Sequence, residues 1–240
     1  NPNPLGGAVV MRDGEVLAAG YHDRYRGPHA ERMAFDYADA HGIDMCGATV
    51  IDTLEPCCHV GSQPACTDLI LAHGIARVVV GSVDPNPIVA GKGLRILEEA
   101  GVEVVRDVMR EECDAINRHF FHYITTGKPY IVDGRRRAGE SDSEYAVRRR
   151  ELYATYAAVL AGTESDVPDE SFAHFNGPVQ AVGADEVVIG GHRPLLLEAG
   201  ALACTDPDEW LSELGKRKID SLIVERDEAF ERLSMACQKD

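Results

Sequence analysis

The sequence has no hydrophobic run near the roughly 18 consecutive apolar residues that a membrane helix needs, and its start lacks the basic-then-apolar layout of a secretion signal. We therefore expect a cytoplasmic protein with no membrane partner. Basic residues are also scarce, because 24 Lys and Arg against 40 Asp and Glu give a formal net charge of −16. A surface of this sign repels nucleic acid, so we expect no nucleic-acid partner.

Cysteine is present in a number and arrangement that exclude a full disulfide framework. The chain has 7 cysteines, an odd number, and Cys57 and Cys58 are adjacent. Reduced thiols, some of them bound to a metal, fit this pattern better.

The one basic cluster consists of residues 135–137 and 148–150, all arginine. We interpret it as a solvated loop and helix face that balance nearby acids. A phosphate or nucleotide patch is the alternative.

Apolar segments alternate between short extended runs and helical stripes through the first half of the 240 residues. The turn pair Asp13-Gly14 predicts a hairpin between the first two strands. This alternation predicts an α/β sandwich with a partly parallel sheet covered on both faces. The expected strands are 8–11, 16–19, 48–52, 77–81 and 102–105, and the expected helices are 29–40, 66–73, 91–100 and 111–123.

The chemistry-bearing motif is His29-Ala30-Glu31, followed by Pro56-Cys57 and later by Cys66. One imidazole and two thiolates fill the three protein positions of a catalytic zinc ion, whose fourth position is left to water. Glu31 is then free to move protons. Zinc nucleobase deaminases carry His-x-Glu and Pro-Cys-x-x-Cys, whereas eight residues separate the two cysteines here.

The secondary-structure pattern places these residues at the ends of elements. His29 and Cys66 each open a predicted helix, where the helix dipole favours a thiolate. Cys57 lies in the loop that leaves the strand ending near Leu54. Because Pro56 sets Cys57 at the strand exit, we prefer Cys57 over its neighbour Cys58 as the ligand and expect Cys58 to be a buried apolar-type residue.

The chain carries a set of linked motifs: Asn3-Pro4, Gly7, Thr53-Leu54-Glu55-Pro56-Cys57-Cys58-His59, Gly61, Pro64-x-Cys66, Asp84-Pro85-Asn86-Pro87, Val89-Ala90-Gly91-x-Gly93 and Gly127-Lys128-Pro129-Tyr130. These motifs resemble those of the bifunctional riboflavin-biosynthesis deaminase/reductase family. The resemblance covers roughly residues 1–130 and is highly specific. It implies a cytidine deaminase-like three-layer α/β/α sandwich, with residues 1–130 as a zinc-dependent deaminase domain. The family usually has a helix before the Asn-Pro segment, whereas this chain begins at that segment.

The resemblance implies hydrolytic deamination of a small-molecule aminopyrimidine, in the family a ribosylaminopyrimidinone phosphate. It implies that Zn²⁺ is bound by His29, Cys57 and Cys66 and that Glu31 is the proton shuttle. Positions that hold substrate in the family correspond to Asn3, His22, Asp84 and Asn86. Asn3 and Asn86 also lie in proline-flanked turns, where Asn is common without any ligand. We expect a homo-oligomer, either a dimer or a tetramer.

Ser62 departs from the family pattern, which has Lys or Arg at this position. Loss of that cation would weaken a phosphate contact. Our hypothesis is that the substrate differs from the usual one, by lacking the phosphate or by carrying another substituent.

Residues 131–240 resemble a truncated reductase-like α/β domain. The family's strand with a catalytic Lys is missing, because residues 131–134 run directly into the arginines. Arg226-Asp227 replaces the glycines that would let cofactor phosphates approach the backbone. We therefore expect no NADPH binding and no reductase activity, and we interpret Gly190-Gly191 as a turn. A helix after Ser141 and strands within 157–163 and 219–225 are the fragments of the family pattern that we expect to persist.

Two alternatives remain open. The first is a deaminase of another nucleoside, nucleotide or amino-heterocycle in a specialised biosynthetic pathway. The second is a non-catalytic scaffold with structural zinc. A structural site would be closed by a fourth protein ligand, and the motif offers three ligands plus Glu31, which favours catalysis on a cyclic amidine.

Overall fold

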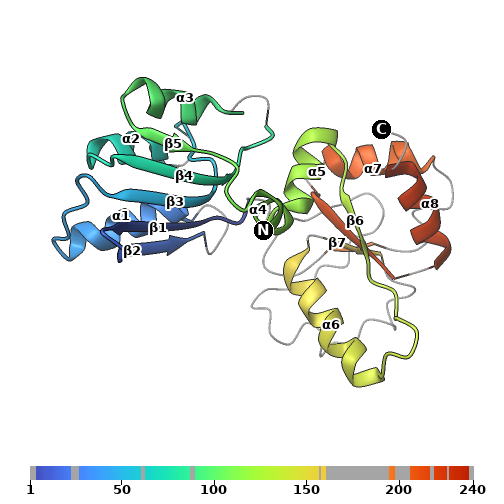
Figure 1. Ribbon diagram of the computed structural model, residues 1–240. Helices are drawn as coiled ribbons and strands as arrows, with labels where there is room; N and C mark the ends of the chain where they lie inside the picture. The colour runs from blue at the N-terminus through green and yellow to red at the C-terminus, as the bar shows by residue number, and fades with distance from the viewer. Residues whose placement is uncertain are drawn as a thin grey trace. The chain divides into compact units, whose positions relative to one another are not determined.

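Two compact units make up the chain, one comprising Asn3–Phe121 and the other including His122–Asp240. Each has its own sheet in the computed structural model (Figure 1). No helix in the described part of the chain is long and apolar enough to cross a membrane. The structure describes residues 4–22, 27–60, 63–86, 90–156, 158–160, 195–197, 206–216, 219–225 and 227–237.

The first unit is built on a five-stranded sheet in the order β2-β1-β3-β4-β5. Strand β1 runs antiparallel to β2 and β3, whereas β3, β4 and β5 are parallel. The expected partly parallel α/β architecture is therefore confirmed. Its elements are β1 (Gly7–Arg12), β2 (Glu15–Tyr21), α1 (Ala30–Ala40), β3 (Thr49–Leu54), α2 (Cys66–Ala72), β4 (Arg77–Ser82), α3 (Lys92–Glu99), β5 (Glu103–Val105), α4 (Arg110–Ile116) and the start of α5 (Arg118–Thr126), whose residues from His122 onward belong to the second unit.

The hairpin between β1 and β2 closes at the predicted Asp13-Gly14 turn. Both residues have positive φ, 53° and 83°, as a two-residue turn of the primed type requires. The turn pairs Met11 with Val16, and the register then shifts by one residue, so that Val10 faces Ala18 and Ala8 faces Gly20. The hairpin thereby brings the end of β2 back towards the start of α1.

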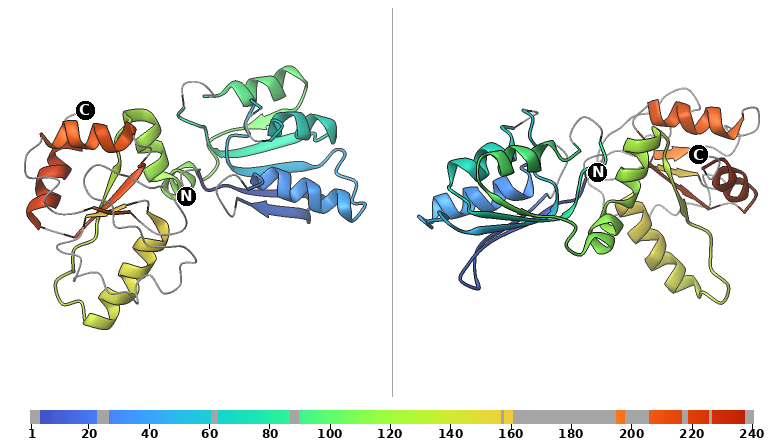
Figure 2. Two further views of the ribbon diagram at one scale, coloured as in Figure 1. Left: turned by 180° about the vertical axis from the view of Figure 1, so that it is seen from behind. Right: turned by 45° about the horizontal axis from the view of Figure 1, so that its top comes forward.

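One face of the sheet carries the main core, which lies under α1, α2 and α3 (Figure 2, right). Gly20 of β2 lies so close to α1 that an added Cβ would meet the backbone of Ala30. The opposite face holds α4, because Cys113 lies against Gly81 of β4. Helices therefore flank the sheet on both sides, as predicted. The buried core residues include Val10, Ala34, Phe35, Ala38, Val50, Ile70, Val78, Val80, Leu94 and Leu97.

The single helix expected over residues 111–123 is wrong, because the structure has two helices, α4 and α5, separated at Asn117. Asn117 is fully buried. Its side chain accepts a hydrogen bond from the backbone N–H of Leu5 (2.7 Å) and donates one to the carbonyl of Leu5 (2.8 Å). This contact pins the break between the helices to the segment that leads into β1.

The second unit contains a parallel sheet in the order β6-β9-β7-β8. Ser141 and Glu144 form a capping box at the start of α6, where a helix was expected. The late strand expected within 219–225 is β9, and β7 covers part of 157–163. The described elements are β6 (Tyr130–Asp133), α6 (Asp142–Thr155), β7 (Ala158–Leu160), β8 (Leu195–Leu197), α7 (Pro207–Lys216), β9 (Ser221–Val224) and α8 (Asp227–Cys237).

A core in this unit forms where α7 and α8 pack on β9. Leu211 and Leu214 of α7 and Leu233 of α8 are buried together with Leu222 and Val224 of β9. Such a continuous apolar strand is typical of a parallel sheet.

Acidic partners lie against four arginines of the cluster, as predicted, but Arg148 and Arg149 are largely buried and do not lie on a solvated helix face. Arg135 pairs with Asp133 (2.9 Å), and Arg148 pairs with Glu140 (2.7 Å). Because these ion pairs occupy the guanidinium groups, they disfavour a phosphate patch.

We expect Asn117→Ala to lower the free energy of unfolding by about 2 kcal/mol, because it removes two buried hydrogen bonds and leaves the Leu5 backbone without its partner. Denaturant unfolding of the two proteins measures this. Glu112→Ala, on the exposed surface of α4, is the control and should change stability by less than about 0.5 kcal/mol. Equal stability of Asn117→Ala and wild type would refute the role of this contact.

Candidate metal centre and active site

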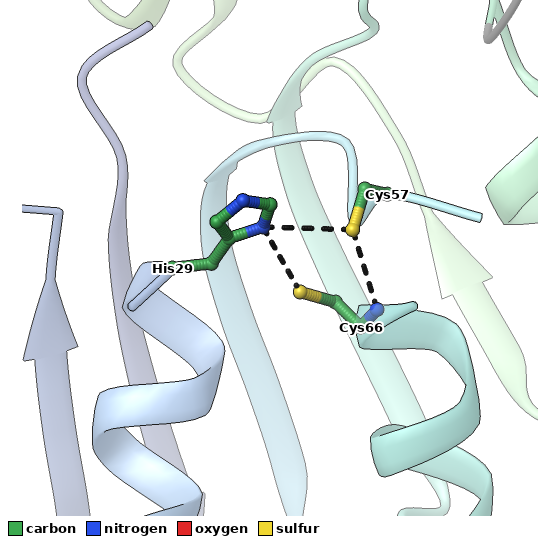
Figure 3. Close-up of side chains that lie close together, drawn as sticks. All are labelled: His29, Cys57 and Cys66. Carbon is green, nitrogen blue, oxygen red and sulfur yellow. Dashed lines mark hydrogen bonds between the residues drawn. The ribbon is translucent and has the colours of Figure 1, made fainter. Parts of the chain in front are cut away.

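His29, Cys57 and Cys66 converge from three separate segments (Figure 3). His29 is the N-cap of α1 and has an extended backbone (φ −67°, ψ 161°). Cys66 is the first residue of α2, and Cys57 lies in the loop after β3. The two helix starts and the strand exit therefore meet at one edge of the sheet, as the sequence predicted.

The three side chains present their donor atoms to a common point. Nδ1 of His29 lies 3.5 Å from Sγ of Cys57 and 3.4 Å from Sγ of Cys66. All three donor atoms lie within 4.8 Å of one another. Donors bound to one tetrahedral zinc ion, with bonds of about 2.0–2.3 Å, lie roughly 3.5–3.8 Å apart. The arrangement therefore fits zinc.

The two cysteines share one proton, and the negative charge lies on Cys57. A hydrogen bond from the Cys66 thiol is the main cause that lowers the pKa of Cys57 to about 4. Burial opposes this shift, whereas His29 and the backbone N–H of Cys66 add to it. The pKa of Cys66 is raised because its thiol donates to Cys57 and because it is buried. The hydrogen bond to Cys57 raises the pKa of His29 against the effect of burial. A divalent cation would replace the protons that these donors share.

Glu31 lies beside this donor group and is not one of the converging metal donors. It is the second residue of α1 and is buried. Burial raises its pKa, while hydrogen bonds from its own backbone and from Cys66 act in the opposite direction. A carboxyl group placed in this way can exchange a proton with a group bound next to the sulfurs.

Of the four residues predicted to bind substrate, the structure describes His22, Asp84 and Asn86. His22 is buried, and its Nδ1 lies 2.9 Å from the carbonyl oxygen of Pro28. Its ring contacts the ring of His29 edge-on, with 5.9 Å between the ring centroids. Asp84 and Asn86 lie in the loop after β4, where the N–H of Asn86 donates to the Asp84 carboxylate (2.8 Å). Burial raises the pKa of Asp84. Asn3 and Ser62 lie outside the described residues.

Two buried acids near the site were not predicted. Glu55 directly precedes Pro56 and accepts three backbone hydrogen bonds from the loop between β4 and α3. Asp52 of β3 has no hydrogen-bond partner for either carboxylate oxygen among the described residues. Its pKa is raised well above the usual value, first by burial and then by the charge of Glu31. The available signal for Asp52 was its position two residues after the apolar Val50, which places both side chains on the same face of β3.

Comparisons with known proteins point to one family. Residues 1–82 match the family model for the cytidine and deoxycytidylate deaminase zinc-binding region. The riboflavin biosynthesis protein RibD of Actinobacillus pleuropneumoniae is 35% identical over 94% of this chain and 72% of its own length. The chain belongs to the RibD family. The predicted resemblance is thereby confirmed, and so is the enzyme class, a zinc-dependent deaminase.

Other relatives agree on the RibD assignment but are matched over different shares of their length. RibD of Escherichia coli is 42% identical over 71% of this chain and only 49% of its own length. The crystal structure of a diaminohydroxyphosphoribosylaminopyrimidine deaminase/5-amino-6-(5-phosphoribosylamino)uracil reductase from Thermotoga maritima matches with a TM-score of 0.75 and 31% identity. That match covers 98% of this chain and 78% of the Thermotoga chain. The cytidine deaminase-like fold of RibD structures is therefore also the fold of this chain.

We expect Cys57→Ser to reduce bound zinc from about one ion per chain to less than about a tenth, because a hydroxyl is a poor replacement for a thiolate ligand. Elemental analysis of the purified proteins measures this. The neighbouring Cys58 is partly exposed rather than fully buried as predicted, and it lies outside the converging donor group. Cys58→Ser is therefore the matched control and should keep its zinc; loss of zinc from both variants alike would contradict the ligand assignment.

Proposed function

We propose that this chain hydrolyses the exocyclic amine of an aminopyrimidine riboside of the riboflavin-pathway type and releases ammonia. The observation that carries the proposal is the convergence of one imidazole and two thiols beside the buried carboxyl of Glu31. The similar Thermotoga maritima protein is a diaminohydroxyphosphoribosylaminopyrimidine deaminase, which supports this substrate class.

In this proposal His29, Cys57 and Cys66 hold the zinc ion through Nδ1 and two Sγ atoms. When bound, zinc supplies the Lewis acidity that lets water act as a nucleophile near neutral pH. Three converging protein donors are typical of a catalytic site with an open fourth position, whereas a structural site is closed by a fourth donor. No fourth His, Cys, Asp or Glu joins the group among the residues that the structure describes. This favours catalysis over the scaffold alternative.

Glu31 carries protons in both halves of the reaction. It accepts a proton from the attacking water and passes it to the ring nitrogen next to the amine-bearing carbon. After the C–O bond has formed, Glu31 takes the second proton of the former water and delivers it to the amine nitrogen. The C–N bond then breaks, ammonia leaves, and the carbon becomes a carbonyl. Burial suits this role, because it raises the pKa of Glu31 and allows the carboxyl group to hold a proton at a higher pH.

The substrate-binding roles of Asn3, His22, Asp84 and Asn86 belong to the same proposal. His22 supports it by its ring contact with His29. Asp84 supports it by its place in the loop after β4, where its carboxylate accepts the N–H of Asn86 (2.8 Å). The homo-oligomeric state and the cytoplasmic location remain predictions from the sequence.

Deamination of a different amino-heterocycle is the second candidate function. The observation that favours it is Ser62, which replaces the basic residue of the family pattern. A substrate without the phosphate would not need that cation.

We further propose that residues 131–240 have no reductase activity. Arg149 and Glu225 form a buried ion pair, with Nε 2.7 Å and Nη2 2.6 Å from the two carboxylate oxygens, directly after β9. The first residue of the next helix, α8, is the acid Asp227. Negative charge at a helix start opposes the phosphate groups of a dinucleotide, which bind there in other proteins.

We expect Glu31→Gln to reduce ammonia release by at least about 100-fold, because general acid–base catalysis contributes about that much or more. Zinc content should not change. The assay uses diaminohydroxyribosylaminopyrimidine with and without its 5′-phosphate, together with cytidine, so that both candidate functions are compared. Asp36→Asn, on the exposed surface of the same helix, is the control and should keep full activity. An active Glu31→Gln protein would eliminate the proposed proton carrier.

We expect the protein to leave NADPH absorbance unchanged in the presence of the deaminated product, since the acid Asp227 at the start of α8 opposes the phosphate groups of a dinucleotide. Titration of the protein with NADPH, followed by calorimetry, measures binding separately. Product-dependent loss of NADPH absorbance would disprove this part of the proposal.

A further inference from the structure

Glu55 is a buried acid in contact with two parts of the first unit. It follows the last residue of β3 and precedes Pro56 and Cys57. Its side chain is 5% exposed. Its backbone N–H donates to the carbonyl of Ser82 at the end of β4 (2.8 Å), which continues the pairing of the two parallel strands. This backbone hydrogen bond fixes the position of Glu55 independently of the contacts of its side chain.

The carboxylate of Glu55 accepts three backbone hydrogen bonds from the segment between β4 and α3. Oε2 accepts from the N–H of Asp84 (3.2 Å) and from that of Gly91 (2.8 Å), while Oε1 accepts from the N–H of Gly93 (3.0 Å). Gly91 and Gly93 lie at the start of α3, where the helix dipole favours a negative charge. One side chain thereby fixes both ends of this segment.

Glycine at two positions allows this close approach. Gly91 has a φ of 71°, in the left-handed region that disfavours other residues. A Cβ at position 93 would collide with the carbonyl oxygen of Pro56 and press on Oε1 of Glu55. The start of α3 therefore packs directly on the backbone of the loop that carries Cys57.

The segment held by Glu55 begins with the loop that contains Asp84 and Asn86. The Asp84 side chain itself accepts the N–H of Asn86 (2.8 Å), so the position of one residue fixes the other. The start of α3, at the other end of the segment, packs on the carbonyl of Pro56 next to Cys57. Displacement of Asp84 would therefore move a candidate binding surface relative to the metal donors.

We propose that Glu55 is a positioning residue that holds the substrate-binding loop of Asp84 and Asn86 in register with the metal-binding loop of Cys57. This inference rests on the proposed deaminase function, because it assigns substrate contact to the Asp84 loop. Glu55 acts through that loop and touches neither substrate nor metal. Its loss therefore weakens substrate binding more than it slows the chemical step.

Glu55→Gln is the sharpest test, because the amide has nearly the same shape as the carboxylate. A glutamine has one acceptor oxygen, whereas the three N–H groups require acceptors at both oxygen positions. At least one N–H group would face an NH₂ group instead. We expect KM for the aminopyrimidine riboside to rise about tenfold or more while kcat changes less than about threefold. Zinc content should remain that of the wild type.

Hydrogen exchange of the backbone amides provides a readout that does not depend on turnover. In Glu55→Gln the amides of Asp84, Gly91 and Gly93 should exchange about tenfold faster or more, while those of α1 remain unchanged. The matched control is Glu99→Gln, an exposed position at the other end of α3. It should match the wild type in exchange, KM and kcat.

Unchanged KM together with unchanged exchange in Glu55→Gln would overturn the inference. A parallel fall of kcat, zinc content and thermal stability would also overturn it, because a general structural role predicts that pattern. If the wild type releases no ammonia from any substrate of the panel, the proposed function fails. The exchange of the three amides then still decides whether Glu55 fixes the loop.

Discussion

Two sulfur atoms and one imidazole nitrogen within 4.8 Å of one another form the interaction on which the first unit depends. Two thiolates at this separation repel each other, so the pKa of Cys57 is lowered while that of Cys66 is raised, and the hydrogen bond to Cys57 raises the pKa of His29. A divalent cation resolves this conflict, because it pairs with both thiolates at once. The geometry of a cation site is thus a property of the folded chain.

The sheet makes this convergence possible. Strands β3 and β4 are parallel, so their carboxyl ends lie at the same edge, and the loops that follow them carry Cys57 and Asp84 to one place. The hairpin of β1 and β2 supplies the third segment, because the close contact of Gly20 with α1 brings the start of that helix against the sheet. Such loops carry the candidate functional residues, and the rigid strands fix the distances between them.

Local sequence signals predicted much of this arrangement. Pro28 before a helix, Asp13-Gly14 between strands and a continuous apolar β4 each act over a few residues, and their elements appeared where expected. The break at Asn117 could not be predicted in the same way. It depends on hydrogen bonds to Leu5, a residue 112 positions away. The role of Glu55 is hidden for the same reason, since its three partners lie 29 to 38 positions further along the chain.

Asp52 gives the fold a particular response to acidity. The pKa of this buried acid is raised well above 3.8 in the folded chain, whereas in the unfolded chain it returns to the ordinary value. In the unfolded state Asp52 therefore loses its proton first as the pH rises from about 4. Its stabilising contribution to the folded state is fully present below that pH and is lost as the pH rises through the raised pKa. At neutral pH such a group lowers the stability of the folded state. The first unit holds this group in its central strand, β3, near the buried carboxyl group of Glu31.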